Sequence, residues 1–492
     1  MSAPSPTPEH PFAAARFDFA AAVAPVETYD RVHFLAIGGA GMSGVARIML
    51  ARGVEVTGTD AKDVPVLKAL ASEGATVWVG FDPEHQAGAD AVVMSSSIRP
   101  DNVELVAARD RGVPVLHRAQ GLAALMVGQR AVAVAGANGK TTTTSLLTVA
   151  LQGCGLDPSF AVGGELAKHG TNAHRGTDDV FVVEADESDG SFVVYHPEVA
   201  IVTNVQPDHL DFYDNFKVVQ AAYAAFARTI RPGGLLVTCA DDAGAVALAR
   251  EARGHGTRVV TYGFDPGADV VLTEHRQDGL TSAAELRDGD RPVSLVLGVP
   301  GRHNALNAAA AYAAAVHGLG QDPERVLAGL ASFTGTRRRF EPKGIVADVA
   351  VVDDYAHNAG KVTAVVETAV SLAAGSGRVV VVFQPHLYSR TRDFAAELGA
   401  GLAPADVVIV MDVYAAREDP LPGVSGELVA QAVRDARPEA EVHYVPSWSQ
   451  VAETVAGLAR PGDLVLTVGA GDVTMIGPEV LRLLGPVAGG SA

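Results

Sequence analysis

Cysteine is nearly absent from this sequence, since only Cys154 and Cys239 occur among 492 residues and they form no CxxC pair. Two such residues cannot build a disulfide framework or a thiolate zinc site. Long apolar runs are also missing. The longest, from Ala308 to Val316, is far shorter than the roughly 20 residues that cross a bilayer, and the N-terminus lacks a basic segment followed by an apolar one. These absences predict a cytoplasmic protein without membrane insertion.

Basic residues are in deficit, because 38 Lys and Arg stand against 57 Asp and Glu and give a net charge of −19. A protein that coats nucleic acid or an anionic membrane needs a basic face, so we expect neither partner. Apolar residues make up 48% of the chain and charged residues 19%, which is typical of a folded protein. Its length corresponds to about three domains of roughly 150 residues each.

Short apolar runs followed by helical stretches recur in three series, which begin near residues 32, 131 and 349. Such alternation predicts mainly parallel sheets covered by helices. We therefore predict an α/β protein of three domains, over residues 30–128, 129–336 and 337–492. The first and third domains are expected to be Rossmann-like and the central one similar to a P-loop ATPase. Residues 1–29, rich in Ser, Pro and Ala, are expected to be a loose extension.

A glycine-rich GxGxxG motif follows the first apolar run and opens a helix; it comprises Gly39, Ala40, Gly41, Met42, Ser43 and Gly44. Helix N-terminal amides and a close backbone approach suit a diphosphate at such a place. Asp60 ends the next predicted strand, so the motif alone predicts NAD bound through its ribose and keeps a dehydrogenase open. The alternative is a tight strand-to-helix turn without a ligand.

A second glycine loop begins the central domain and comprises Gly136, Ala137, Asn138, Gly139, Lys140 and Thr141, with Thr142 next in the helix. Lys140 offers a charge for the outer phosphates of a nucleoside triphosphate, and the Thr141 hydroxyl is a ligand for magnesium. Val134 stands where a full Walker A motif has its first glycine, so this is a shortened variant. A GKT of structural meaning only is the competing interpretation.

Polar loops follow several other predicted strands, where ligands of α/β sheets bind. Glu184 to Asp189 (EADESD) and Asn204 to Asp211 (NVQPDHLD) offer hard oxygens for magnesium, and His209 suggests a metal or phosphate role. A solvated acidic loop and an ordinary histidine are the alternatives. Asn304, before an Ala-rich helix, is either a helix cap or a reader of a nucleobase. Arg390, in the third domain, suits a carboxylate.

Taken together, the motifs resemble the Mur ligases, the ATP-dependent amide-forming enzymes of peptidoglycan precursor assembly. The matching segments are HFLAIGGAGMSG, EADESD, VPGRHNALNA, the RRF junction, DDYAH, FQPHLYSRT and DVYAARE. The resemblance covers essentially the whole chain after the extension. Within the family it is greatest to the branch that adds L-alanine to UDP-N-acetylmuramate.

The resemblance implies a role for each motif. The first glycine loop, with Asp60, would bind the uridine diphosphate of UDP-N-acetylmuramate, which displaces NAD. ATP would be a substrate, together with two magnesium ions. The remaining roles would be Lys140 on the outer phosphates; Thr141 and Glu184 on one magnesium and His209 on a second; Asn304 on adenine; Arg339 on the phosphates; Asp354 on the ribose; and Tyr355, His357, His386 and Arg390 around L-alanine.

The sequence also departs from the family pattern. Asn138 stands where the phosphate loop usually has His, and DDYAH is followed by Asn358, Ala359, Gly360 and Lys361 instead of His-Pro-Thr-Glu. Between Val218 and Ala227 there is no Lys that could be carbamylated, which is usual in the alanine-adding branch.

Three other functions are weighed against the alanine-adding one. The first is a recycling ligase that attaches a tripeptide to the same sugar nucleotide. The second is a dinucleotide-dependent oxidoreductase, which would leave Lys140, Glu184 and His209 without a role. The third is a non-catalytic nucleotide-binding regulator, which would tolerate the loss of those groups. The oligomeric state, including a homo-oligomer, stays open.

Overall fold

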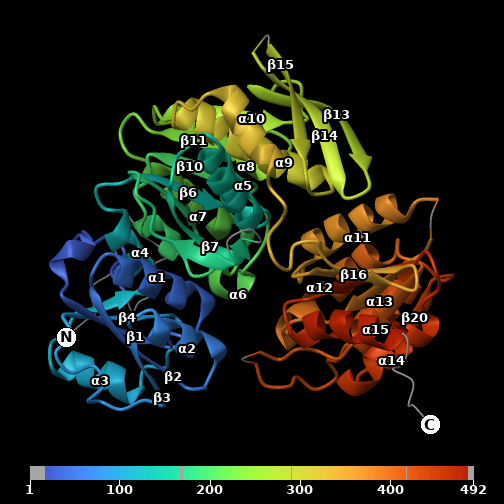
Figure 1. Ribbon diagram of the computed structural model, residues 1–492, viewed down its shortest axis with the longest axis horizontal. Coiled ribbons are helices and arrows are strands. Elements are labelled where there is room, and N and C mark those ends of the chain that lie inside the picture. The colour runs from blue at the N-terminus through green and yellow to red at the C-terminus, as the bar shows by residue number, and fades with distance from the viewer. Residues whose placement is uncertain (1–16, 167–169, 290, 376, 417, 486–492) are drawn as a thin grey trace. The chain divides into compact units, whose positions relative to one another are not determined.

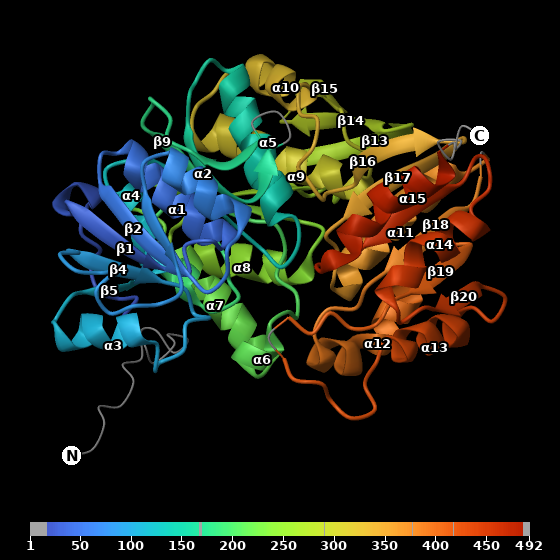
Figure 2. The same cartoon turned by 60° about the horizontal axis from the view of Figure 1, so that its bottom comes forward.

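The computed structural model describes residues 17–166, 170–289, 291–375, 377–416 and 418–485. Their contacts divide the chain into two units. The first runs to Glu274 and includes Ala284–Val296 and Ala305–Phe333; the second comprises His275–Ala283, Leu297–Asn304 and the chain from Thr334. Among the described residues the strands form three sheets (Figures 1 and 2).

The first sheet belongs to the first unit and is parallel throughout, with the order β3-β2-β1-β4-β5. Its strands are β1 (Arg31–Leu35), β2 (Glu55–Asp60), β3 (Thr76–Val79), β4 (Ala91–Met94) and β5 (Val115–His117). The accompanying helices are η1 (Val26–Thr28), α1 (Ala40–Ala51), α2 (Pro65–Ser72), α3 (Val103–Asp110) and α4 (Arg118–Met126).

The second sheet has the order β15-β14-β13-β12-β11-β10-β6-β9-β7-β8, and the strands from β12 to β7 along it are parallel. Its strands are β6 (Arg130–Ala135), β7 (Ser159–Leu166), β8 (Thr171–His174), β9 (Val180–Glu184), β10 (Val199–Val202), β11 (Leu235–Cys239), β12 (Arg258–Gly263), β13 (Val270–Asp278), β14 (Thr281–Asp288) and β15 (Arg291–Leu297). The helices are α5 (Lys140–Gly153), η2 (Ser191–Val194), α6 (Leu210–Tyr213), α7 (Phe216–Arg228), α8 (Ala243–Gly254), α9 (Arg302–Ala313), η3 (Ala314–Gly318) and α10 (Pro323–Ala331).

The third sheet lies in the second unit, with the order β16-β17-β21-β18-β19-β20, and only β16 runs antiparallel to its neighbour. Its strands are β16 (Glu341–Val346), β17 (Val349–Asp354), β18 (Val379–Phe383), β19 (Val407–Val410), β20 (Glu441–Tyr444) and β21 (Leu464–Val468). The helices are α11 (Ala359–Ala373), α12 (Tyr388–Leu402), α13 (Glu427–Ala436), α14 (Trp448–Leu458), η4 (Asp472–Met475) and α15 (Ile476–Leu484).

Helices cover both faces of the third sheet, which explains why β18 and β19 are apolar at every position. In β18, Val379, Val381 and Phe383 pack with residues of α11, α12 and α13, whereas Val380 and Val382 pack with residues of α14 and α15. Successive side chains of a strand point to opposite faces, so a strand covered on both sides needs an unbroken apolar run. The predicted α/β class with mainly parallel sheets is confirmed.

The N-terminal extension differs from the expectation of a loose segment over 1–29. Residues 1–16 lie outside the described residues, but Phe19 and Val26 are buried in the core of the first unit. The ring of Phe17 also packs edge-on against His117, with 4.9 Å between centroids. The described part of this segment is therefore anchored to the core by Phe19 and Val26, with the partly buried Phe17 packed beside them.

No helix in the described part of the chain has both the length and the apolar character needed to cross a membrane.

The second unit includes more of the chain than the third domain expected from residue 337 onward. It begins its last segment at Thr334 and also takes in residues 275–283 and 297–304. Within that unit a Cβ at Gly301 would lie 2.9 Å from Oγ1 of Thr368 in α11, so this loop packs closely on the helix.

Candidate nucleotide and phosphate site

The second glycine loop connects β6 to α5 and takes a shape that only glycine tolerates at two positions. Gly136 and Gly139 have φ values of 136° and 87°. A Cβ at Gly136 would lie 1.9 Å from Oγ1 of Thr203, and one at Gly139 would lie 2.5 Å from Oδ1 of Asn307. The backbone is therefore tightly enclosed, and its turn delivers Lys140 and Thr141 to the first turn of α5.

Lys140 points back over this loop and is held by two acceptors. Its Nζ donates to the carbonyl of Gly136 and to Oε1 of Glu187, both at 2.7 Å. Burial would lower the pKa of the ammonium, but the carboxylates of Glu187, Asp186 and Glu184 outweigh it and raise the pKa. Lys140 thus stays charged at neutral pH, as a phosphate-binding lysine must.

Thr141 and Glu184 lie together at the adjoining strand end. The Thr141 hydroxyl donates to Oε1 of Glu184 at 3.0 Å, and Oε2 of Glu184 accepts from the amide of Gly163 at 2.7 Å. Among the described residues no group of three or more His, Cys, Asp and Glu side chains is arranged to hold a metal. The donor pair nevertheless fits Mg²⁺, which keeps several waters and takes one or two protein oxygens together with substrate phosphates.

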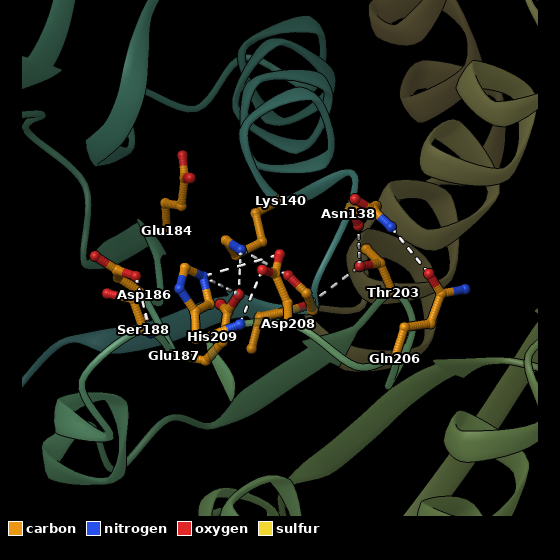
Figure 3. Close-up of polar contacts among 12 residues, drawn as sticks. Asn138, Lys140, Glu184, Asp186, Glu187, Ser188, Thr203, Gln206, Asp208 and His209 are labelled. Atoms are coloured by element: carbon orange, nitrogen blue, oxygen red, sulfur yellow. Dashed lines mark hydrogen bonds and ion pairs between the residues drawn. The ribbon is translucent and has the colours of Figure 1, made fainter. Parts of the chain in front are cut away.

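His209 follows β10 and lies on the same side of the loop, with φ at 52° as the residue before α6. Its Nε2 is 3.7 Å from Oε1 of Glu187 and 3.9 Å from Oδ2 of Asp208. Figure 3 shows Lys140, Glu187 and His209 turned toward one another. The structure therefore brings together the predicted residues Lys140 and His209, through a carboxylate that the sequence analysis did not single out.

Asn138, the residue in the usual His position, is fixed on three sides. Its amide donates to Oδ1 of Asn204 at 2.9 Å and its carbonyl accepts from Nδ2 of the same residue at 2.9 Å. Its side chain donates to Gln206 at 3.0 Å (Figure 3). Gln206 in turn donates to Asp242 at 3.0 Å. The loop after β10, which the sequence analysis had singled out for its oxygen ligands, therefore also braces the phosphate loop through Asn204 and Gln206, a role that was not predicted.

The first glycine loop is exposed only over Gly39 and Ala40, with Gly41 partly covered. Met42, Ser43 and Gly44 are buried inside α1, where they pack rather than face solvent. Asp60 does not lie free at its strand end, because its carboxylate accepts from the amides of Gly38 at 2.9 Å and Lys62 at 3.2 Å.

Arg118, at the start of α4, lies against the first glycine loop. A Cβ at Gly41 would be 2.8 Å from its Nη1. Its Nη2 donates to Oδ2 of Asp186 at 3.1 Å, and Asp186 belongs to the acidic loop after β9. Burial would raise the pKa of Asp186, but the charges of Arg118 and Lys140, with a hydrogen bond from the Ser188 amide, together outweigh burial and lower it. One guanidinium thus links the first glycine loop to the acidic loop after β9, a long-range contact with no local sequence signal.

In the second unit, three of the residues predicted to surround L-alanine have rings that lie in a row. Tyr355 and His357 have centroids 5.2 Å apart, and His357 and His386 are 5.6 Å apart. The pKa of His357 is lowered well below its usual value by burial, with Lys361 and Arg390 contributing. The predicted set of Tyr355, His357, His386 and Arg390 therefore occupies one region.

Asp354 and the Arg-rich junction lie beside this row. Asp354 is buried and accepts from the amides of Phe340 and Ala356, both at 2.7 Å, and burial raises its pKa. Arg339 and Arg338 lie over the Tyr355 ring at 5.5 and 4.8 Å. Arg338, which was not predicted, also donates to the carbonyl of Gly469 at 2.7 Å.

Asn304 belongs to the second unit and donates to the carbonyl of Pro300 at 2.7 Å. Its neighbour His303 is half-buried, and desolvation with the charges of His275 and Arg339 lowers its pKa to about 4. The predicted ATP residues are thus divided between the two units: the glycine loop lies in the first, and Asn304, Arg339 and Asp354 lie in the second.

Three α/β sheets with a lysine-bearing phosphate loop at the end of a parallel strand define the class of nucleotide-dependent α/β proteins. Three family models match the chain: the Mur ligase family catalytic domain over residues 31–130, the Mur ligase middle domain over 134–315 and the Mur ligase glutamate ligase domain over 338–471. The chain belongs to the Mur ligase family.

Individual relatives are similar to this chain over nearly its full length. A UDP-N-acetylmuramate–L-alanine ligase of Kineococcus radiotolerans is 57% identical over 94% of this chain and 98% of its own, and one of Saccharopolyspora erythraea is 52% identical over 92% and 93%. Among solved structures, a UDP-N-acetylmuramate-alanine ligase of Thermotoga maritima has a TM-score of 0.77 at 28% identity, over 92% of this chain and 98% of that one. The resemblance drawn from the motifs is confirmed.

Proposed function

We propose that the chain catalyses the ATP-dependent ligation of L-alanine to the carboxylate of UDP-N-acetylmuramate. The observation that carries the proposal is the phosphate loop with Lys140 beside the Thr141–Glu184 pair. It occurs in a chain 57% identical to a protein named for this reaction. The need for ATP supports the cytoplasmic location predicted from the sequence.

A carboxylate is a poor electrophile, so it must first be activated. One of its oxygens attacks the γ-phosphorus of ATP, ADP leaves, and an acyl phosphate forms. The amine of L-alanine then attacks the acyl carbon, a proton leaves the nitrogen, and the C–O bond to phosphate breaks, which gives an amide and inorganic phosphate. Negative charge gathers on the transferring phosphoryl group, and Lys140 and Arg339 would neutralise it.

The Thr141 hydroxyl and the Glu184 carboxylate would hold one Mg²⁺, as their 3.0 Å contact supports. His209 would serve a second ion. When bound, magnesium offsets the charge of the phosphates. Around the nucleotide, Gly136, Ala137, Asn138, Gly139 and Thr142 would supply amides and packing, with Asn304 on adenine and Asp354 near the ribose.

Gly39, Ala40 and Gly41 would present the N-terminus of α1 to the uridine diphosphate, whereas Met42, Ser43, Gly44 and Asp60 would shape that turn from within. An oxidoreductase would leave Lys140, Glu184 and His209, which lie together at the phosphate loop, without a role. Tyr355, His357, His386 and Arg390 would surround L-alanine, with the Arg390 fork on its carboxylate.

Release of ADP by the purified protein tests the proposal. It should require both UDP-N-acetylmuramate and L-alanine, with no change in nicotinamide absorbance in a parallel reaction. Replacing L-alanine by the free tripeptide that the recycling ligase attaches should stop the release. ADP release with the tripeptide but not with L-alanine would identify the recycling ligase instead. Binding of ATP without any ADP release would identify a regulator.

A further inference from the structure

Glu187 is a carboxylate buried at the centre of the phosphate site, with only 2% of its side chain exposed. Its Oε1 holds the ammonium of Lys140 at 2.7 Å and faces Nε2 of His209 at 3.7 Å. Its Oε2 is buried and has no hydrogen-bond partner within the described ranges. A buried carboxylate with one unsatisfied oxygen is costly, so a role beyond stability has to explain its presence.

The backbone of Glu187 is fixed from two directions. Its carbonyl accepts from the amide of Gly190 at 3.1 Å and from the hydroxyl of Tyr213. Tyr213 ends α6, the short helix that directly follows His209. The acidic loop after β9 is therefore tied to the segment that carries His209, and the carboxylate of Glu187 has a defined place between the two segments.

This placement decides where Lys140 can point. An ammonium has three donors, and here one goes to the Gly136 carbonyl and a second to Glu187, both at 2.7 Å. A lysine stem is flexible, so without the second acceptor the ammonium would sample other positions. With both acceptors in place, the third N–H has a fixed direction and is left for a ligand. Lys140 remains 13% exposed, so it can be reached from outside.

We propose that Glu187 is a positioning residue, which holds the Lys140 ammonium at the mouth of the phosphate loop for transfer of the phosphoryl group. This inference rests on the proposed function. The Lys140–Glu187 pair can be distinguished from a purely structural salt bridge. Loss of a structural pair would affect only folding, whereas loss of a positioning pair slows the catalytic step in a fully folded enzyme.

The test is a split between turnover and nucleotide binding in Glu187→Gln, which keeps the size of the side chain and removes its charge. Turnover with saturating substrates should fall by about tenfold to a hundredfold, because misplacing a charge that acts on the transition state costs this much. The dissociation constant of a non-hydrolysable ATP analogue should stay within about threefold or become tighter, because the lost charge has the sign of the phosphates. Glu187→Asp should recover part of the turnover.

Asp189→Asn is the matched control, because Asp189 lies two residues further along the same loop and contacts Ser96 and His117 rather than Lys140. It should not give the split between turnover and binding. Turnover of Glu187→Gln within twofold of wild type would overturn the inference, as would a loss of turnover that parallels weaker nucleotide binding and a lower melting temperature. A wild-type enzyme without substrate-dependent ADP release would instead overturn the proposed function.

Discussion

The two glycine loops of the first unit are both strand-to-helix turns, but they are built differently. The loop before α5 contains its own cation, Lys140, and left-handed glycines enclosed by Thr203 and Asn307. The loop before α1 has no cation, and its first motif glycine, Gly39, has an ordinary φ of −66°. Its nearest positive charge, Arg118, comes from α4 and pairs with Asp186 of the acidic loop after β9. The proposed triphosphate site is thus encoded in one short motif, whereas the proposed sugar-nucleotide site depends on contacts between distant segments.

Of the substitutions that test this comparison, removal of the Lys140 charge should reduce turnover the most. Lys140→Ala is expected to reduce turnover by about a thousandfold, because the charge that complements the transferring phosphoryl group is lost. The measurement is the rate of ADP release with all substrates, with circular dichroism to verify folding. Turnover near that of wild type in a folded variant would remove Lys140 from the site.

A matched pair of glycine substitutions tests whether the loops differ in backbone strain. Gly139→Ala forces a left-handed residue to carry a Cβ 2.5 Å from Asn307, so it should reduce ATP affinity by about tenfold or more and lower the melting temperature by several degrees. In Gly39→Ala the added Cβ would have no neighbouring atom closer than 3.7 Å, so the free energy of unfolding should be nearly unchanged. Equal losses of stability in the two variants would contradict the comparison.

Replacement of Arg390, the proposed contact of the L-alanine carboxylate, extends the comparison to the second unit. Arg390→Ala should raise the KM for L-alanine by about tenfold to a hundredfold, because a charge-assisted fork on its carboxylate is lost. The KM for ATP should change little. Initial rates at varied L-alanine and varied ATP separate the two, and a variant with weaker ATP binding but normal L-alanine binding would place Arg390 in the nucleotide site.

Loss of the guanidinium beside the first loop should have a smaller effect. Arg118→Gln is expected to raise the KM for UDP-N-acetylmuramate by about fivefold to tenfold, more than that for ATP, because a charge near the α1 N-terminus is lost. If Arg118 acts with Asp186, the effects of Arg118→Gln and Asp186→Asn should not be additive in the double variant. Additive effects would show that the two loop regions are independent.

The sequence predicted the features that depend on local patterns. Unbroken apolar runs such as 131–135 and 379–383 became central strands, because both sheet faces are covered there. Strands with one open face were missed: β13 alternates after Leu272 with Glu274, Arg276 and Asp278 outward, so it contains no long apolar run. The same limit applies to the site. Lys140 and Thr141 are part of a recognisable sequence motif. Glu187, by contrast, is one of five polar residues in the segment EADESD, and nothing in the local sequence identifies it as the partner of Lys140.

The path of one oxygen atom tests the central claim most directly. UDP-N-acetylmuramate labelled with ¹⁸O in its carboxylate is incubated with the enzyme, ATP and L-alanine, and the released phosphate is analysed by mass spectrometry. If the carboxylate attacks the γ-phosphorus and the amine then displaces phosphate, one labelled oxygen appears in inorganic phosphate. Label in AMP would show that the carboxylate attacks the α-phosphorus instead. Phosphate released without label would contradict an acyl phosphate altogether.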